Sequence, residues 1–115
     1  MAGFENTVFD DMLDTFSARA SEGSIHTSDP GSTGDEEVSG GDYSRQPLNW
    51  ASASGGSASV SSTVTFDIPV NTTVTHLGFW DSAETWLGSI ELSEAESFVG
   101  AGTLDVDPIT VSLNN

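Results

Sequence analysis

The chain has 115 residues, enough for a single domain, and its hydrophobic share of 36% lies below the share of about 45 to 50% that is usual in globular proteins. The sequence sets 18 Asp and Glu residues against Arg19 and Arg45, with no lysine, for a formal net charge of -16. This balance excludes nucleic acid as a partner, because duplex binding requires Lys and Arg to neutralise phosphates. The absence of cysteine excludes disulfides, thiolate nucleophiles and Cys-ligated metals.

The acidic excess predicts adaptation to brine. In dilute buffer the carboxylates repel one another and destabilise the compact state. The Debye length falls from about 10 Å at 0.1 M salt to about 3 Å at 1 M, so surface carboxylates hardly interact in concentrated salt. We therefore expect this lysine-free surface to suit multimolar salt.

The N-terminal sequence MAGFENTVFDDML lacks the features of a signal peptide. It carries acidic residues where a signal peptide carries basic ones, and it has no run of about seven or more apolar residues. No stretch of the chain approaches the roughly 20 apolar residues that span a bilayer. We expect neither export by this route nor a membrane partner.

Residues 1–23 predict an N-terminal amphipathic helix, centred on residues 4–20. Four apolar residues recur at every fourth position and form one stripe: Phe4, Val8, Met12 and Phe16. Phe9 and Leu13 broaden this stripe, and acidic side chains cover most of the remaining surface. Two interpretations stay open: the stripe packs into the core of its own domain, or part of it contacts a neighbouring subunit.

Residues 24–46 predict an extended loop or arm, because they are rich in the turn formers Gly, Ser, Thr and Asp. Ile25, Val38 and Tyr43 offer apolar anchors, which favours an ordered arm. The acidic run at residues 35–37 offers oxygen ligands for Ca²⁺ or Mg²⁺, but its spacing does not match an EF-hand. We interpret the run as a solvated loop and assign no metal site.

Residues 47–115 predict a β-domain that forms a single structural unit with the helix and the arm. Residues 57–68 alternate between apolar and polar side chains, and residues 72–80, 85–92 and 103–113 have similar strand character, with a weaker strand at 48–52. Residues 94–96 form an acidic break, and the register of the last strand shifts across Pro108, as at a bulge or a sheet edge. The predicted fold class is mainly β: a small antiparallel β-sandwich or barrel, preceded by the N-terminal amphipathic helix and the long arm.

The sequence contains no convincing catalytic site. His26 and His76 belong to different elements, and we interpret each as a hydrogen-bonded structural histidine. There is no G-x-S-x-G elbow and no triad arrangement, so we expect no enzyme and no cofactor. The three tryptophans, Trp50, Trp80 and Trp86, either pack in the core, which their inward phase favours, or stack on sugar rings.

Three segments carry a family resemblance: IHTSDPGSTGDEEVSGGDYSRQ, VNTTVTHLGFWD and WLGSIELSE. In order and spacing they resemble a family of small tailed-phage virion proteins, described as head-decoration or tail-fibre-like proteins. The resemblance covers roughly residues 24–113 and rests on the patterns H-T-x-x-P-G, E-V-S-G-G-x-Y-x-R-Q and T-H-x-G-x-W-D. The chain departs from the family in its lack of lysine and its added acids, which suggests a haloarchaeal virus.

Arg45 lies in one of the matched segments and is one of only two cations. We expect it to pair with a fixed carboxylate, for which Asp81 is one candidate, or to contact another subunit. The residues that we predict at a subunit interface come from the helix stripe and the arm: Phe4, Val8, Met12, Phe16, Tyr43 and Arg45.

The resemblance implies a virion structural protein with no catalytic activity. The leading hypothesis is a capsid decoration protein that assembles on the head as a homo-oligomer, such as a trimer or a pentamer, and contacts the major capsid protein or other virion proteins. The capsid exterior is favoured over the tail. One alternative is a tail, baseplate or fibre-associated component, and a second is a carbohydrate-binding module for host attachment.

Overall fold

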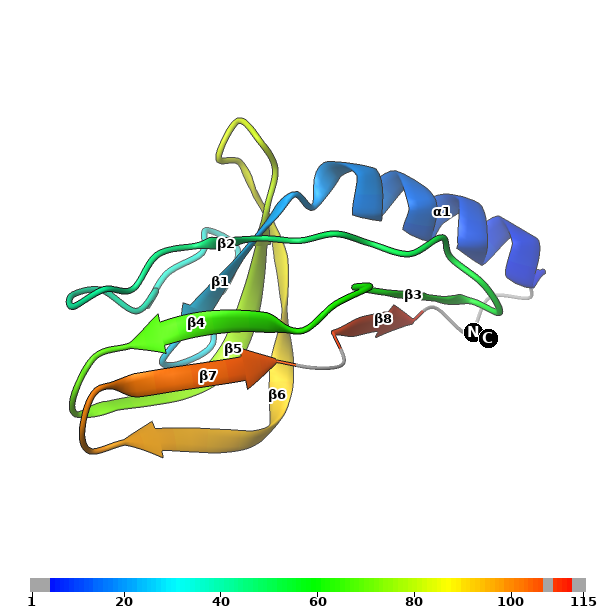
Figure 1. Cartoon of the computed structure of the whole chain (residues 1–115). Helices are drawn as coiled ribbons and strands as arrows, with labels where there is room; N and C mark the ends of the chain where they lie inside the picture. Colours follow the sequence, from blue (N-terminus) through cyan, green and yellow to red (C-terminus); the bar gives the residue numbers. More distant parts are fainter. Residues whose placement is uncertain (1–4, 107–108, 113–115) are drawn as a thin grey trace.

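The computed structural model describes residues 5–106 and 109–112. Its elements are α1 (Asn6–Arg19), β1 (Glu22–His26), β2 (Gln46–Pro47), β3 (Ser57–Ser59), β4 (Val64–Ile68), β5 (Thr72–Trp80), β6 (Trp86–Phe98), β7 (Gly102–Val106) and β8 (Thr110–Ser112) (Figure 1). One N-terminal helix followed by antiparallel strands confirms the predicted fold class, a mainly β protein with a small sandwich. No helix in these residues has the length and apolar character that a membrane span requires.

The largest sheet has four strands in the order β2-β1-β5-β6, and all of its pairings are antiparallel. Two smaller antiparallel pairs, β4 with β7 and β3 with β8, form the second layer. Figure 1 shows β4 and β7 running across the four-stranded sheet, while α1 extends along the same side as β3. Between the layers, Phe66 of β4 packs in one core cluster with Ile25 of β1 and Phe79 of β5.

β1 occupies an inner position in the sheet, where it pairs with β5 from Glu22 opposite Trp80 to His26 opposite His76. Residues 24–26, which the sequence assigned to the arm, therefore lie in a buried strand. Their sequence conceals this, because Ser24 and His26 are polar and only Ile25 carries an aliphatic side chain. The two polar side chains are accommodated because each has a hydrogen-bond partner inside the protein.

The predicted strand at residues 72–80 is confirmed in full as β5. The single strand predicted at 57–68 is wrong: residues 60–63 separate β3 from β4, and the two halves pair with different strands, β8 and β7. The predicted last strand is likewise divided into β7 and β8, and the register shift expected at Pro108 lies outside the described residues. Alternation reports which face of each segment is apolar, but it does not report whether consecutive segments share one sheet.

β6 continues to Phe98, through the acidic residues 94–96 that the sequence assigned to a break. Glu96 pairs with Val74 and Glu91 pairs with His76, so residues 92–95 of β6 lie opposite Thr75 alone. Such an insertion is a β-bulge, which bends the strand, and Figure 1 shows β6 turning along its length. Acidic residues are tolerated here because β6 is an edge strand and Glu94 and Glu96 are exposed.

α1 docks on the β-layers through its apolar face and two of its acids. Phe16 packs edge-on against Trp50 and Phe79, with ring centroids 5.7 and 5.2 Å apart. On the same helix, the Asp10 carboxylate accepts a hydrogen bond from the Gly56 backbone N–H at 2.8 Å, and Asp14 accepts one from Ala53 at 2.9 Å. The helix is thus fastened to the segment that leads into β3.

Candidate functional site

The helix stripe that was predicted as a subunit interface divides between core and solvent. Phe16 packs on the core, whereas Val8 and Met12 are 38% and 47% exposed. Phe4 lies outside the described residues. The face that packs on the core is formed instead by positions spaced four, three and four apart: Phe9, Leu13, Phe16 and Ala20. That spacing averages close to 3.6 residues, while a strict spacing of four turns progressively away from the core.

The arm is held to the sheet by a cluster that we call the arm clamp, which consists of Glu37, Tyr43, Arg45, Trp80 and Glu84. Arg45 donates two hydrogen bonds to the Glu37 carboxylate, from Nε to Oε2 at 3.0 Å and from Nη2 to Oε1 at 2.9 Å. Tyr43 donates a third to Oε2 at 2.8 Å. This two-pronged arrangement uses the rigid fork of the guanidinium, which lysine lacks.

The clamp also fastens the arm to both inner strands of the main sheet. The Tyr43 hydroxyl accepts a hydrogen bond from the Ile25 backbone N–H of β1 at 3.0 Å. The guanidinium carbon of Arg45 lies 3.8 Å from the ring centre of Trp80 in β5, a cation–π contact, and Nη1 lies 3.5 Å from the exposed carboxylate of Glu84. The arm is therefore an ordered part of the domain.

Electrostatics stabilise the charged form of the clamp. Burial alone would raise the pKa of the Glu37 carboxyl, but the hydrogen bonds from Arg45 and Tyr43 outweigh it and hold that pKa below its ordinary value. The hydrogen bonds to Glu37 raise the pKa of the Arg45 guanidinium, and burial raises the pKa of the Tyr43 hydroxyl. Glu37 and Arg45 consequently form an ion pair at neutral pH.

The expected partner of Arg45 was wrong. Asp81 lies near Arg19 instead, with Oδ2 3.7 Å from Nη2, and its Oδ1 accepts backbone hydrogen bonds from Ala83 and Thr85. The hydrogen bond from Thr85 is the largest of the effects that lower the pKa of Asp81. Sequence reasoning missed Glu37 because it lies in an acidic run. The sequence feature that could have identified Glu37 is its position next to the apolar anchor Val38, which is buried.

A serine and a histidine meet in the core beneath the clamp. Ser24 Oγ lies 2.7 Å from His26 Nε2, and His26 Nδ1 lies 2.8 Å from the carbonyl oxygen of Asp35. A carbonyl only accepts, so Nδ1 carries the proton and the Ser24 hydroxyl donates to Nε2. Trp80 Nε1 donates to Ser24 Oγ at 2.8 Å, which completes the network.

This Ser–His pair is structural rather than catalytic. Both residues are fully buried, so no substrate reaches them, and burial lowers the pKa of His26. A Cβ placed on Gly78 would lie 2.6 Å from both Ser24 Oγ and His26 Nε2, which shows how closely the strands approach. The interpretation of both histidines as hydrogen-bonded residues is confirmed, since His76 Nδ1 lies 2.7 Å from Thr75 Oγ1.

The part of the chain that the structure describes contains no group of three or more His, Asp or Glu residues placed to hold a metal ion. Within the acidic run at residues 35–37, Glu37 belongs to the clamp, while Asp35 and Glu36 are exposed. The described residues thus form no metal site here, and the exposed side chains of the helix, the arm and the loops are the surfaces that remain for contacts.

Comparison with known proteins places the whole arrangement in a family. A family model described as "Podophage GP4 fiber I protein gp80" matches residues 7–112, from the first turn of α1 to the end of β8. A search of curated proteins gave no match.

Proposed function

The chain belongs to the family of the podophage GP4 fiber I protein gp80, and from this membership we propose that it is a structural component of the tail fibre apparatus of a tailed virus. The family match over residues 7–112 is the observation that carries the proposal. Membership supports a virion structural protein, and the word "fiber" in the family description favours the tail over the capsid exterior. Capsid decoration, the leading hypothesis from the sequence, therefore becomes the alternative.

The geometry agrees with a role in assembly. The protein is elongated, with extents of 46 × 26 × 24 Å, and its arm is fastened to the sheet by the arm clamp. Tyr43 and Arg45, which we predicted at an interface, use their polar groups within the chain. Of the predicted interface residues that the structure describes, Val8 and Met12 have exposed side chains, so we propose that a homo-oligomer forms through this part of α1.

Immunogold labelling of intact virus particles tests the position. An antibody against this protein is expected to mark the tail in electron micrographs. Label confined to the head would overturn the tail proposal and support decoration. Label on neither, with the protein absent from purified particles by mass spectrometry, would overturn a virion role altogether.

Sedimentation equilibrium of the full chain in molar NaCl tests the oligomer. We expect an oligomeric mass for the natural protein and a shift towards the monomer for Met12→Glu, because a charge at an apolar contact is costly to bury. Thr7→Glu serves as a matched control, because it adds the same charge at an exposed position that the helical spacing turns away from Val8 and Met12. A monomer for the natural protein at all concentrations would contradict this proposal.

A further inference from the structure

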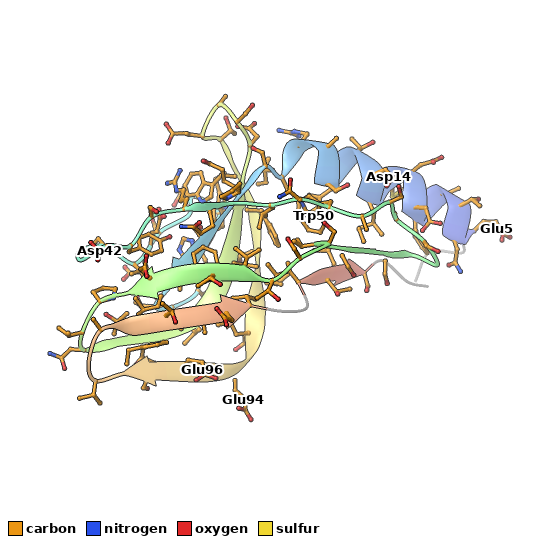
Figure 2. The ribbon with its side chains drawn as sticks, viewed as in Figure 1. Glu5, Asp14, Asp42, Trp50, Glu94 and Glu96 are labelled. Atoms are coloured by element: carbon orange, nitrogen blue, oxygen red, sulfur yellow. The ribbon has the colours of Figure 1, made fainter. Side chains whose placement is uncertain are left out.

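An open groove of about 350 Å³ lies between the second half of α1 and the segment of residues 48–52 that precedes β3. Its lining includes five polar side chains and one tryptophan: Asp14, Ser17, Ser21, Asn49, Ser52 and Trp50. Figure 2 shows Asp14 on the helix and Trp50 on the neighbouring segment. The groove lies apart from the arm clamp and shares no residue with it.

Trp50 is fixed in the wall of this groove. Its indole Nε1 donates to the Ala20 carbonyl at 2.8 Å, and its ring packs against Phe16 and Phe79 with centroids 5.7 and 5.9 Å apart. The ring is nevertheless only partly buried, whereas Trp80 is 8% exposed. Because its N–H is occupied, the accessible part of the ring offers an apolar surface that is already held in place.

Polar side chains line the groove beside this ring, and one of them has an atom without a partner. Ser21 Oγ is buried and has no hydrogen-bond partner, and among the described residues it is the one buried side-chain N or O atom in that condition. Buried polar atoms are almost always paired, so an unpaired hydroxyl in a groove wall indicates a missing partner. The exposed side chains of Asn49 and Ser52 add an amide and a further hydroxyl to the rim.

We propose that this groove binds a neutral saccharide, as a mono- or disaccharide unit of a larger glycan. The apolar face of a sugar ring fits against an indole, while its hydroxyls pair with amide, hydroxyl and carboxylate groups. The volume lies at the lower end of the range of about 300 to 1,000 Å³ for small-molecule sites. Asp14 in the groove and the net charge of -16 disfavour an acidic glycan.

Two-dimensional NMR of the full chain in molar NaCl tests the proposal by titration with glucose, galactose, mannose, N-acetylglucosamine, lactose, maltose and chitobiose. We expect at least one of these sugars to produce saturable shifts of the Trp50 indole N–H and the amides of residues 49–52. Asn49→Ala is expected to raise the dissociation constant about three- to tenfold, because one hydrogen bond to the sugar is lost. Ser82→Ala, in the distant β5–β6 turn, is the matched control and should leave it unchanged.

Three results would overturn the proposal. The first is the absence of saturable shifts for every sugar in this panel. The second is binding that Asn49→Ala leaves unaltered, which would place the sugar elsewhere. The third is a shift of the same groove resonances on raising the protein concentration without sugar, which would identify a second copy of the chain as the occupant. The proposal rests on the groove and not on the position in the virion, so its failure would leave the immunogold result untouched.

Discussion

Glu37 and Arg45 show how much one ion pair contributes to the order of the arm. Their side chains are 22% and 23% exposed, so water screens the pair less than it screens a surface salt bridge. Glu37 accepts two hydrogen bonds from Arg45 and one from Tyr43, so its removal leaves three donor groups without their acceptor. Loss of a buried acceptor is more costly than the net value of the bonds themselves.

Glu37→Gln is therefore expected to lower the free energy of unfolding by about 1 to 2 kcal/mol, since the amide cannot accept both prongs of the guanidinium. Urea unfolding at neutral pH and constant salt measures the change. Glu84→Gln is the matched control, because Glu84 is 76% exposed and its contact with Arg45 should contribute less than about 0.5 kcal/mol. Equal effects of the two substitutions would show that the clamp does not depend on the buried pair.

His26 makes the stability dependent on pH. Its pKa lies below the ordinary value of 6.5 because burial disfavours the charged ring. Between the folded-state pKa of His26 and pH 6.5, the unfolded chain binds more protons than the folded chain. The free energy of unfolding is therefore greatest above pH 6.5 and decreases as pH falls towards the folded-state pKa. Urea unfolding free energies at about pH 7.5, 6.5 and 5.5 should decline in this order. His26→Gln should remove most of the decline, and an unchanged slope in that variant would assign it to other groups.

At the scale of elements, α1 is held by polar contacts as well as by its apolar face. Its N-cap residue, Glu5, makes no side-chain hydrogen bond to the helix, so the first turn has no side-chain cap of its own. Asp10 and Asp14 bind the amides of Gly56 and Ala53 instead and join the helix to the next segment. Acids that the sequence analysis assigned to the solvent-facing surface thus have a specific structural role.

Asp10→Ala should lower the unfolding free energy by about 1 kcal/mol, the typical contribution of such a hydrogen bond. Amide hydrogen exchange should become faster at Gly56, which loses its acceptor. The neighbouring Asp11→Ala is the control: Asp11 is exposed, and the Thr15 hydroxyl donates to its backbone carbonyl, which the substitution keeps. Unchanged exchange at Gly56 in Asp10→Ala would mean that the contact does not hold the segment.

Across the whole molecule, acidic side chains lie at several widely separated points. Figure 2 shows Glu5 at the start of α1, Asp42 at the end of the arm, and Glu94 and Glu96 on the bent part of β6. Both arginines are already paired within the chain, Arg19 with Asp81 and Arg45 with Glu37. With both arginines next to acids of the same chain and a net charge of -16, close approach of two molecules depends on salt.

Adaptation to brine stays a prediction, and salt titration tests it. Lowering NaCl from about 2 M to about 0.1 M should lower the free energy of unfolding by about 1 kcal/mol or more, because screening of the acids is lost. Urea is the suitable denaturant, since it adds no ions. Circular dichroism and sedimentation that stay unchanged over this range, with an unchanged urea midpoint, would refute the prediction.

Particular residues show how far sequence patterns reached. The β-branched and aromatic residues in 72–80 predicted β5 in full, because their strand preference holds although burial increases along the strand and its last four residues are all buried. The alternation in residues 57–68 could not reveal that the strand divides at residues 60–63. Arg45 was recognised as a residue needing a carboxylate, yet its partner Glu37 could be identified only from the folded arm. The groove beside Trp50 joins segments about 30 residues apart, which no local pattern connects.

The sequence by itself determined the mainly β fold class, the N-terminal helix, the acidic surface and the resemblance to tailed-phage virion proteins, because composition, periodicity and motif spacing are local or additive properties. Only the tertiary structure decided that β1 is an inner strand, that Val8 and Met12 are exposed while Phe16 is packed, and that Ser24 and His26 are sealed in the core. These outcomes depend on which segments meet in space. Burial and hydrogen-bond partners are set by these tertiary contacts, and a pattern along the sequence does not specify them.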